Sequence, residues 1–165
     1  MILDEASSMD QEQDEVRAAD SSSRNGSETS MDYRAEQSDS ETERKTVLVV
    51  EDDEAVSSLL VALLEDRGYN AVPALDGRSA VELARKLVPH LITLDLALPG
   101  SDGHEVLANL KSDARTRDIP IVVISAFTQI LPAGDRKKLA YLLGKPFDVS
   151  EVLDIVQATV GNPYV

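Results

Sequence analysis

Short apolar runs that alternate with amphipathic helical segments constrain the fold of this chain more than any other feature. Residues 47–50 (VLVV) form a continuous, β-branched-rich apolar run, which is typical of a strand buried on both faces of a parallel sheet. Residues 54–67 then carry apolar side chains at helical spacing. Gly68 follows at the position where a glycine commonly ends a helix. The sequence therefore predicts a strand followed by a helix.

The same alternation continues to the end of the chain. We expect further strands at residues 70–74, 91–94, 119–125 and 139–143. We expect further helices at residues 76–87, 104–111, 133–138 (a short one) and from 148 onward. Asp76 is a plausible N-cap, and residues 148–151 (DVSE) resemble a capping box. Five strands that alternate with five helices predict an α/β, doubly wound parallel sheet with helices on both faces.

Residues 1–45 have a different composition from the rest of the chain. They contain thirteen Asp or Glu, five Lys or Arg and nine Ser, and their few apolar residues show no strand or helix period. Such a segment buries too little surface to offset the entropy of ordering it. We therefore expect a disordered, acidic, Ser-rich N-terminal extension at 1–45, followed by one domain at 46–162. The extension is interpreted as a solvating spacer or as a docking or phosphorylation segment.

Composition also excludes several classes of function. The net charge of −14 argues against direct nucleic-acid binding, which needs clustered cations. The absence of cysteine excludes disulfides, thiolate metal sites and cysteine nucleophiles. The apolar runs are too short for a membrane span, and the first residues do not form a signal peptide. We expect a cytoplasmic protein that does not contact membranes.

Polar side chains follow the predicted strands where each strand ends. Glu51, Asp52 and Asp53 follow the first strand, Asp95 the third, Ser125 ends the fourth, and Lys145 follows the fifth. In a parallel sheet these positions meet at one edge, where ligands bind. Converging carboxylates suit Mg²⁺, and a lysine and a hydroxyl can hold phosphoryl oxygens. A helix N-terminus alone also favours acids, which is the simpler interpretation of the acidic triplet.

In this order and at these separations, four motifs resemble the receiver domain of two-component response regulators. The motifs are VLVVEDD at 47–53, LDLALPGSDG at 94–103, VVISA at 122–126 and KPF at 145–147. The resemblance covers residues 46–160. It implies a flavodoxin-like fold with five parallel strands in the order 2-1-3-4-5. It also implies a phosphoprotein of a phosphorelay, not a true enzyme, whose turnover is limited to its own phosphorylation and dephosphorylation.

The resemblance implies a role for each motif position. Asp95 corresponds to the phosphoacceptor, and Ser125 and Lys145 correspond to the residues that contact the phosphoryl group. Mg²⁺ is expected on Glu51, Asp52, Asp95 and the backbone carbonyl of Ala97. Asp53 is interpreted as a helix-start residue, and Pro146 occupies the family's usual cis-proline position.

The segment between Ser125 and Lys145 departs from the family pattern. It is about two residues shorter than usual, and Pro132 and Gly134 stand where a fourth helix is expected. The family's aromatic switch position, three before the lysine, holds Leu142, while Tyr141 lies one place earlier. Either the alignment slips locally or the aromatic switch is absent. Phe127 lies where the family tunes dephosphorylation by steric access, and its ring either slows the attacking water or simply packs.

Three functions compete on this sequence. The first is a single-domain response regulator that takes a phosphoryl group from a histidine kinase or histidine phosphotransfer protein. Because one helix is expected after Lys145, its output would pass through an unknown downstream protein, and a homodimer stays open. The second is a phosphorylation-independent pseudo-receiver that only binds partners. The third, a haloacid-dehalogenase-type hydrolase, is disfavoured because Ala97 replaces the second acid that its chemistry needs.

Overall fold

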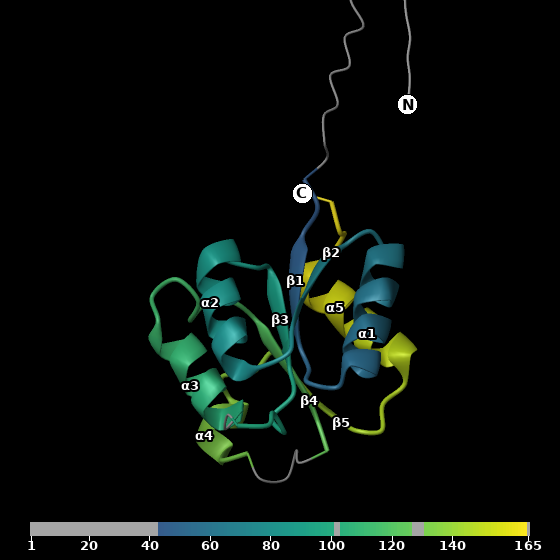
Figure 1. The fold of residues 1–165 in the computed structure, drawn as a ribbon. Helices are drawn as coiled ribbons and strands as arrows, with labels where there is room; N and C mark the ends of the chain where they lie inside the picture. The colour runs from purple at the N-terminus through teal and green to yellow at the C-terminus, as the bar shows by residue number, and fades with distance from the viewer. Residues whose placement is uncertain (1–42, 101–102, 127–130, 165) are drawn as a thin grey trace, which may run out of the picture. The chain divides into compact units, whose positions relative to one another are not determined.

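A five-stranded parallel sheet forms the centre of the domain. The computed structural model describes residues 43–100, 103–126 and 131–164. The strands follow the order β2-β1-β3-β4-β5 (Figure 1). Their bounds are β1 Thr46–Val50, β2 Asn70–Ala74, β3 Leu91–Leu94, β4 Ile121–Ser125 and β5 Tyr141–Gly144. The predicted fold class and the 2-1-3-4-5 order are therefore confirmed.

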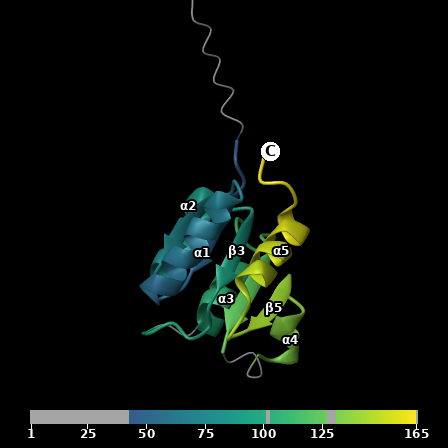
Figure 2. The ribbon, with the colours of Figure 1, turned by 90° about the vertical axis from the view of Figure 1, so that its right-hand side faces the viewer.

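Five helices cover the two faces of this sheet. Their bounds are α1 Glu54–Asp66, α2 Gly77–Leu87, α3 Gly103–Ser112, α4 Ala133–Arg136 and α5 Val149–Val160. α1 and α5 lie on one face, and α2 and α3 lie on the other (Figures 1 and 2). Each face has its own apolar core. Leu64 and Val156 pack in the first, and Ala84 and Leu110 pack in the second. Strands β1, β3 and β4 are buried on both sides, as their continuous apolar runs predict.

The helix boundaries agree with the local signals in the sequence. The Asp76 side chain accepts a hydrogen bond from the Ser79 N–H at 2.8 Å, so it caps α2 as predicted. Gly68 follows α1 with φ +93°, a conformation that glycine adopts without a steric penalty. Asp148 caps α5 but accepts from the Ser150 N–H rather than from Glu151, so its side chain does not bond where a capping box would place it.

Two strand boundaries were predicted too early. β4 begins at Ile121 rather than at 119, because Pro120 lacks an N–H and the Ile119 N–H donates within a turn to Thr116 O. β5 covers Tyr141–Gly144 rather than residues 139–143. The cause is the turn after α4, in which the Leu139 N–H still donates to Arg136 O.

Several predictions concern residues that the structure leaves undescribed. Residues 1–42 of the acidic extension and the Phe127 side chain lie outside the described ranges, so their interpretation stays a prediction. None of the helices within the described ranges has the length and apolar character of a membrane span.

Candidate functional site

The carboxyl edge of the sheet collects the polar residues named from the sequence. Val50 of β1 pairs with Leu94 of β3, which in turn pairs with Val123 of β4. This register places the residues that follow each strand side by side. Glu51 follows Val50 and Asp95 follows Leu94, while Ser125 is the last residue of β4.

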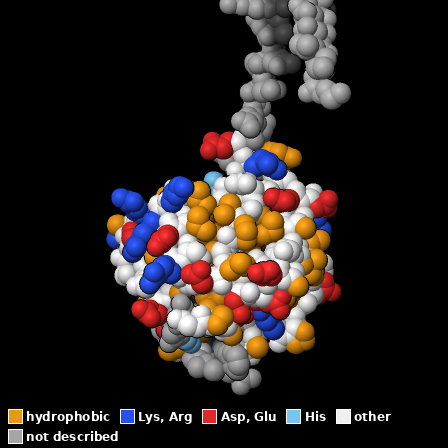
Figure 3. All heavy atoms as spheres, viewed as in Figure 1, with side chains coloured by type: hydrophobic (Ala, Val, Ile, Leu, Met, Phe, Trp, Pro, Cys, Tyr) orange, Lys and Arg blue, Asp and Glu red, His pale blue; other side chains and the backbone are white. Residues whose placement is uncertain are grey.

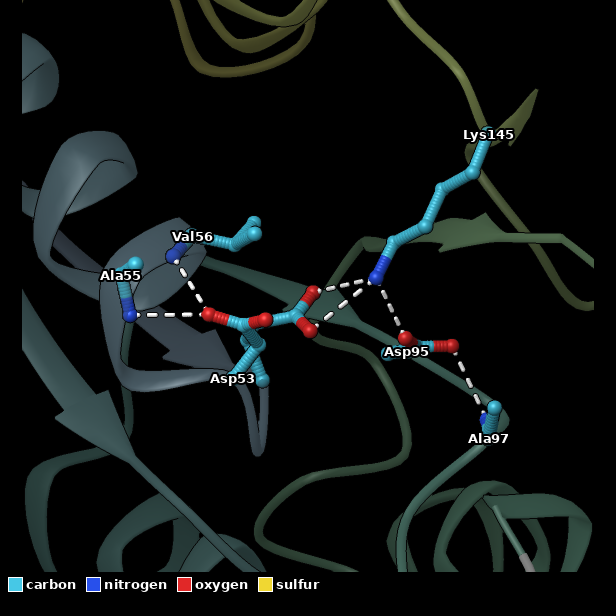
Figure 4. A network of polar contacts seen from close by, with 7 residues as sticks. Asp53, Ala55, Val56, Asp95, Ala97 and Lys145 are labelled. Carbon is cyan, nitrogen blue, oxygen red and sulfur yellow. Dashed lines mark hydrogen bonds and ion pairs between the residues drawn. The ribbon is translucent and has the colours of Figure 1, made fainter.

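Lys145 joins two of these carboxylates in one ion cluster. Its Nζ lies 2.5 Å from Asp95 Oδ2 and 2.7 Å from Glu51 Oε2, with Glu51 Oε1 at 3.0 Å. Both acidic side chains are only 4% exposed, and the lysine side chain is 23% exposed. Figure 4 shows Lys145 reaching from the end of β5 toward Asp95. One cation thus contacts two buried carboxylates and offsets part of their negative charge.

Burial and ion pairing set the protonation of this cluster. The pKa of Glu51 is raised because burial disfavours its charged form more than the contacts with Lys145 favour it. Burial alone would lower the pKa of Lys145, but its hydrogen bonds with Asp95 and Glu51 outweigh this effect and raise it. Lys145 therefore carries its positive charge at neutral pH.

Three carboxylates at this edge can converge on a metal ion. Oxygen atoms of Glu51, Asp52 and Asp95 lie within 4.8 Å of one another. Carboxylate oxygens at partly buried positions are the hard ligands that Mg²⁺ prefers, so the donor set fits this ion. The predicted contribution of the Ala97 carbonyl stays a prediction. The Ala97 N–H, however, donates to Asp95 Oδ1 at 2.9 Å and fixes that carboxylate (Figure 4).

Asp53 is separate from this cluster. Its side chain accepts hydrogen bonds from the N–H groups of Ala55 at 2.9 Å and Val56 at 3.1 Å, so it caps α1 (Figure 4). The interpretation of Asp53 as a helix-start residue is confirmed. The simpler interpretation of the acidic triplet thus applies to one residue of the three.

Ser125 and Lys145 are held together through the backbone. Ser125 is fully buried at the end of β4 and pairs in register with Gly144. The Lys145 N–H donates to the Ser125 carbonyl at 3.1 Å, and the peptide bond between Lys145 and Pro146 is cis. The structure therefore places the hydroxyl residue and the lysine on neighbouring strand ends, as the sequence motifs predict.

The register of β5 answers the question about the switch position. Leu142 pairs with Val123 and packs against the core beneath α2 and α3, whereas Tyr141 pairs with Val122 on the opposite face. Tyr141 is 47% exposed. The pairing of β5 with β4 runs without interruption from Tyr141 to Gly144, so Leu142 faces the core and the aromatic ring lies on the other side of the sheet.

The contact between Lys145 and Glu51 was missed from the sequence. Lysine was expected to contact the phosphoryl group, and Glu51 was expected to contact the metal. The parallel topology already places both side chains at one edge, where an unpaired buried carboxylate would be costly. That argument predicts that Lys145 and Glu51 lie close together. It does not predict which carboxylate the ammonium group contacts, because the long lysine side chain can reach several.

Comparisons with known proteins agree on one family. The family model of the response regulator receiver domain matches residues 47–157. The DNA-binding dual master transcriptional regulator RpaA of Synechocystis sp. is 43% identical over 115 residues, which are 68% of this chain but 47% of RpaA. The chain thus spans about half of that relative. The polar-differentiation response regulator DivK of Brucella abortus is 33% identical over 124 residues, which are 72% of this chain and 98% of DivK.

Solved structures show the same similarity. The receiver domain of the sensor histidine kinase PA1611 from Pseudomonas aeruginosa has magnesium coordinated in its active-site cleft. It is 27% identical, with a TM-score of 0.63 over 72% of this chain and 99% of that one. A sensor protein from Polaromonas sp. is 29% identical, with a TM-score of 0.66 over 73% of this chain and 98% of that one.

Proposed function

Because this chain belongs to the family of response regulator receiver domains of two-component systems, we propose that Asp95 accepts a phosphoryl group from a histidine kinase or a histidine phosphotransfer protein. The observation that carries the proposal is the contact of Lys145 with Asp95 and Glu51 at the carboxyl edge of the sheet. In this arrangement the buried nucleophile, Asp95, has a fixed cation and acidic side chains beside it.

The transfer can be written from these residues. A carboxylate oxygen of Asp95 attacks the phosphorus of a phosphohistidine, a P–O bond forms, the P–N bond breaks, and the histidine leaves with the electron pair of that bond. The Ala97 N–H orients the Asp95 carboxylate during the attack. Lys145 then exchanges its contact with Asp95 for one with a phosphoryl oxygen, and Ser125 donates to another.

Glu51, Asp52 and Asp95 are the residues that would hold Mg²⁺. When bound, this ion neutralises charge on the phosphoryl oxygens and the surrounding carboxylates. The chain's own residues set the geometry: Asp95 is positioned by the Ala97 N–H, and the Asp53 cap anchors the segment that carries the other two acids.

We propose output through protein–protein contacts by a single receiver, with the downstream partner undefined. The match to DivK over 98% of its length supports this. The alternative, a pseudo-receiver that does not depend on phosphorylation, is favoured by two observations. α4 spans only Ala133–Arg136, and Tyr141 does not occupy the switch position.

A single experiment separates the two functions. The protein is incubated with Mg²⁺ and a small acyl phosphate, and its intact mass is measured. We expect the gain of one phosphoryl group, which Asp95→Asn abolishes. Asp53→Asn is the matched control, because asparagine also caps a helix and Asp53 lies outside the cluster. No mass gain in the unaltered protein would exclude the phosphoacceptor function.

A further inference from the structure

A groove between α1 and the edge strand β2 has no role in the proposed phosphotransfer. Its volume is about 480 Å³, within the usual range of binding pockets. Figure 3 shows this side of the domain, where apolar side chains gather over β2 between α1 and α2 and acidic side chains border them. None of the eight lining residues belongs to the cluster around Lys145.

One wall of the groove is a continuous stripe of α1. Its residues recur at the spacing of neighbours on a single helix face and are Glu54, Ser57, Ser58, Val61, Ala62 and Glu65. The buried residues of α1 are Ser57, Leu60 and Leu64, and of these only Ser57 also lines the groove. The stripe thus runs along the border between the buried face of α1 and its exposed face, with Ser57 at the buried side.

Two residues form the other wall. Pro73 lies within β2, and Leu75 is the first residue after the end of β2. Positions two apart point to the same side of a strand, so both side chains face α1. Leu75 is 44% exposed, although it is a large apolar residue. β2 is the outer strand of the sheet, and Pro73 lacks the N–H that an added strand would need. A helix therefore fits this groove better than a further strand.

A buried hydroxyl without a partner lines the same groove. Ser57 is 2% exposed, and its Oγ has no hydrogen-bond partner among the described residues. Buried polar atoms nearly always have a partner, and an unpaired one is costly. The hydroxyl oxygen itself is almost fully enclosed, so a polar group of an occupant would reach it after a small local opening beside α1. Ser57 thus marks the groove as more than a chance depression of the surface.

The charged residues of the groove indicate which kind of partner helix would fit it. Among the described residues that line the groove, only Glu54 and Glu65 are charged, and they stand at the two ends of the stripe. They are eleven positions apart on one helix, which is roughly 16 Å. Between them lie Val61 and Ala62, facing Leu75. The complementary ligand carries cations at both ends and apolar side chains in between.

We propose that the α1–β2 groove binds an amphipathic helix of a partner protein, with a Lys or Arg near each end and an apolar centre that includes one polar side chain for Ser57. Such a helix would lie beside α1 and extend the helical layer over the outer strand. Its cations would pair with Glu54 and Glu65 at the rim, where they set orientation and salt sensitivity. This inference does not depend on phosphorylation of Asp95.

The test uses the full chain and a synthetic helical peptide with two lysines eleven positions apart and a leucine-rich face between them. Amide chemical shifts are recorded during titration. We expect the changes to gather in residues 54–65 and 71–75, and Glu65→Lys to weaken binding at least tenfold. Asp66→Lys is the matched control, since Asp66 is an exposed acid on α1 outside the groove. The amide spectrum of each variant verifies its fold.

Two further peptides sharpen the result. Replacing the two lysines by glutamates should abolish binding, and replacing a central leucine by glutamine should strengthen it in the unaltered chain but not in Ser57→Ala. Equal weakening by Glu65→Lys and Asp66→Lys, or binding of the glutamate peptide, would overturn the proposal. So would sedimentation showing self-association of the chain that Glu65→Lys disrupts, because the occupant would then be a second copy.

Discussion

Lys145 Nζ lies 2.7 Å from Glu51 Oε2 while it also contacts Asp95, so one lysine joins two buried carboxylates from different strands. Removing the cation would leave two nearly inaccessible anions without compensation. The lysine is therefore a structural residue as well as one of the proposed phosphotransfer residues.

We expect Lys145→Met to lower the free energy of unfolding by about 2–4 kcal/mol in Mg²⁺-free buffer at neutral pH, since breaking a buried ion pair is costly. Added Mg²⁺ should restore part of this loss, because it supplies the missing positive charge. Urea denaturation with and without Mg²⁺ measures both effects. Lys138→Met is the control, as that exposed lysine pairs only with Asp135 at the surface. Equal losses in both variants would contradict this account.

A second prediction concerns the altered switch position. Leu142 packs into the core, and Tyr141 lies exposed on the other face of β5. The position three before Lys145 therefore holds no aromatic ring that could move between exposed and buried positions. We expect a phosphoryl mimic to slow amide exchange around Asp95 and Lys145 but to change residues 131–144 little. Hydrogen exchange with and without the mimic measures this. A large change throughout 126–145 would show an ordinary response.

The sequence predicted which residues meet at the carboxyl edge of the sheet because the end of each strand depends on local signals. Continuous apolar runs predicted β1 and β3, and Glu51 and Asp95 are the residues that directly follow these two runs. The parallel strand order alone then predicts that these strand ends lie at one edge of the sheet, before any side-chain contact is known. The Lys145–Glu51 pair could not be predicted, since it depends on a side chain that can reach several acceptors.

The start of β5 was mispredicted for a related reason. Leu139 and Ala140 are apolar, so periodicity alone cannot separate them from the strand that follows. The hydrogen bond from the Leu139 N–H to Arg136 O keeps the chain in a turn. That bond depends on where α4 ends, and a four-residue helix carries too few residues to show a period.

A third prediction uses the N-cap of α2. The backbone N–H of Ser79 is the main cause that lowers the pKa of Asp76 below its ordinary value of 3.8. A depressed pKa in the folded state means that the carboxylate stabilises the fold above pH 3.8 and loses this effect as pH falls through the lower folded value. We expect Asp76→Ala to cost about 1 kcal/mol at pH 7, the usual loss for an N-cap.

Urea denaturation at several pH values tests the cap. The difference between the unaltered chain and Asp76→Ala should shrink as the solution is acidified toward and below pH 3.8. Asp76→Asn should retain most of the stability at pH 7, because asparagine also caps helices. Asp154→Ala is the control, as that exposed acid lies within α5 and caps nothing. A difference that stays constant with pH would contradict a role for the charge.

The last prediction links the loop after β3 to the phosphoacceptor. A Cβ added at Gly103 would overlap Leu96 Cα and lie 2.6 Å from the Leu96 carbonyl oxygen, so α3 begins in direct contact with the backbone of that loop. Leu96 is the neighbour of Asp95, whose carboxylate is held by the Ala97 N–H. Gly103→Ala must therefore push the loop away from α3 or move the helix.

We expect Gly103→Ala to lower the free energy of unfolding by about 1–3 kcal/mol, the usual cost of overpacking. It should also slow phosphorylation of Asp95 by a small acyl phosphate, because the displaced loop carries both the nucleophile and the N–H that orients it. Gly134→Ala is the matched control, since a Cβ there meets no atom within 4 Å. If both alanine variants were phosphorylated at the rate of the unaltered chain, the position of this loop would not govern the reactivity of Asp95.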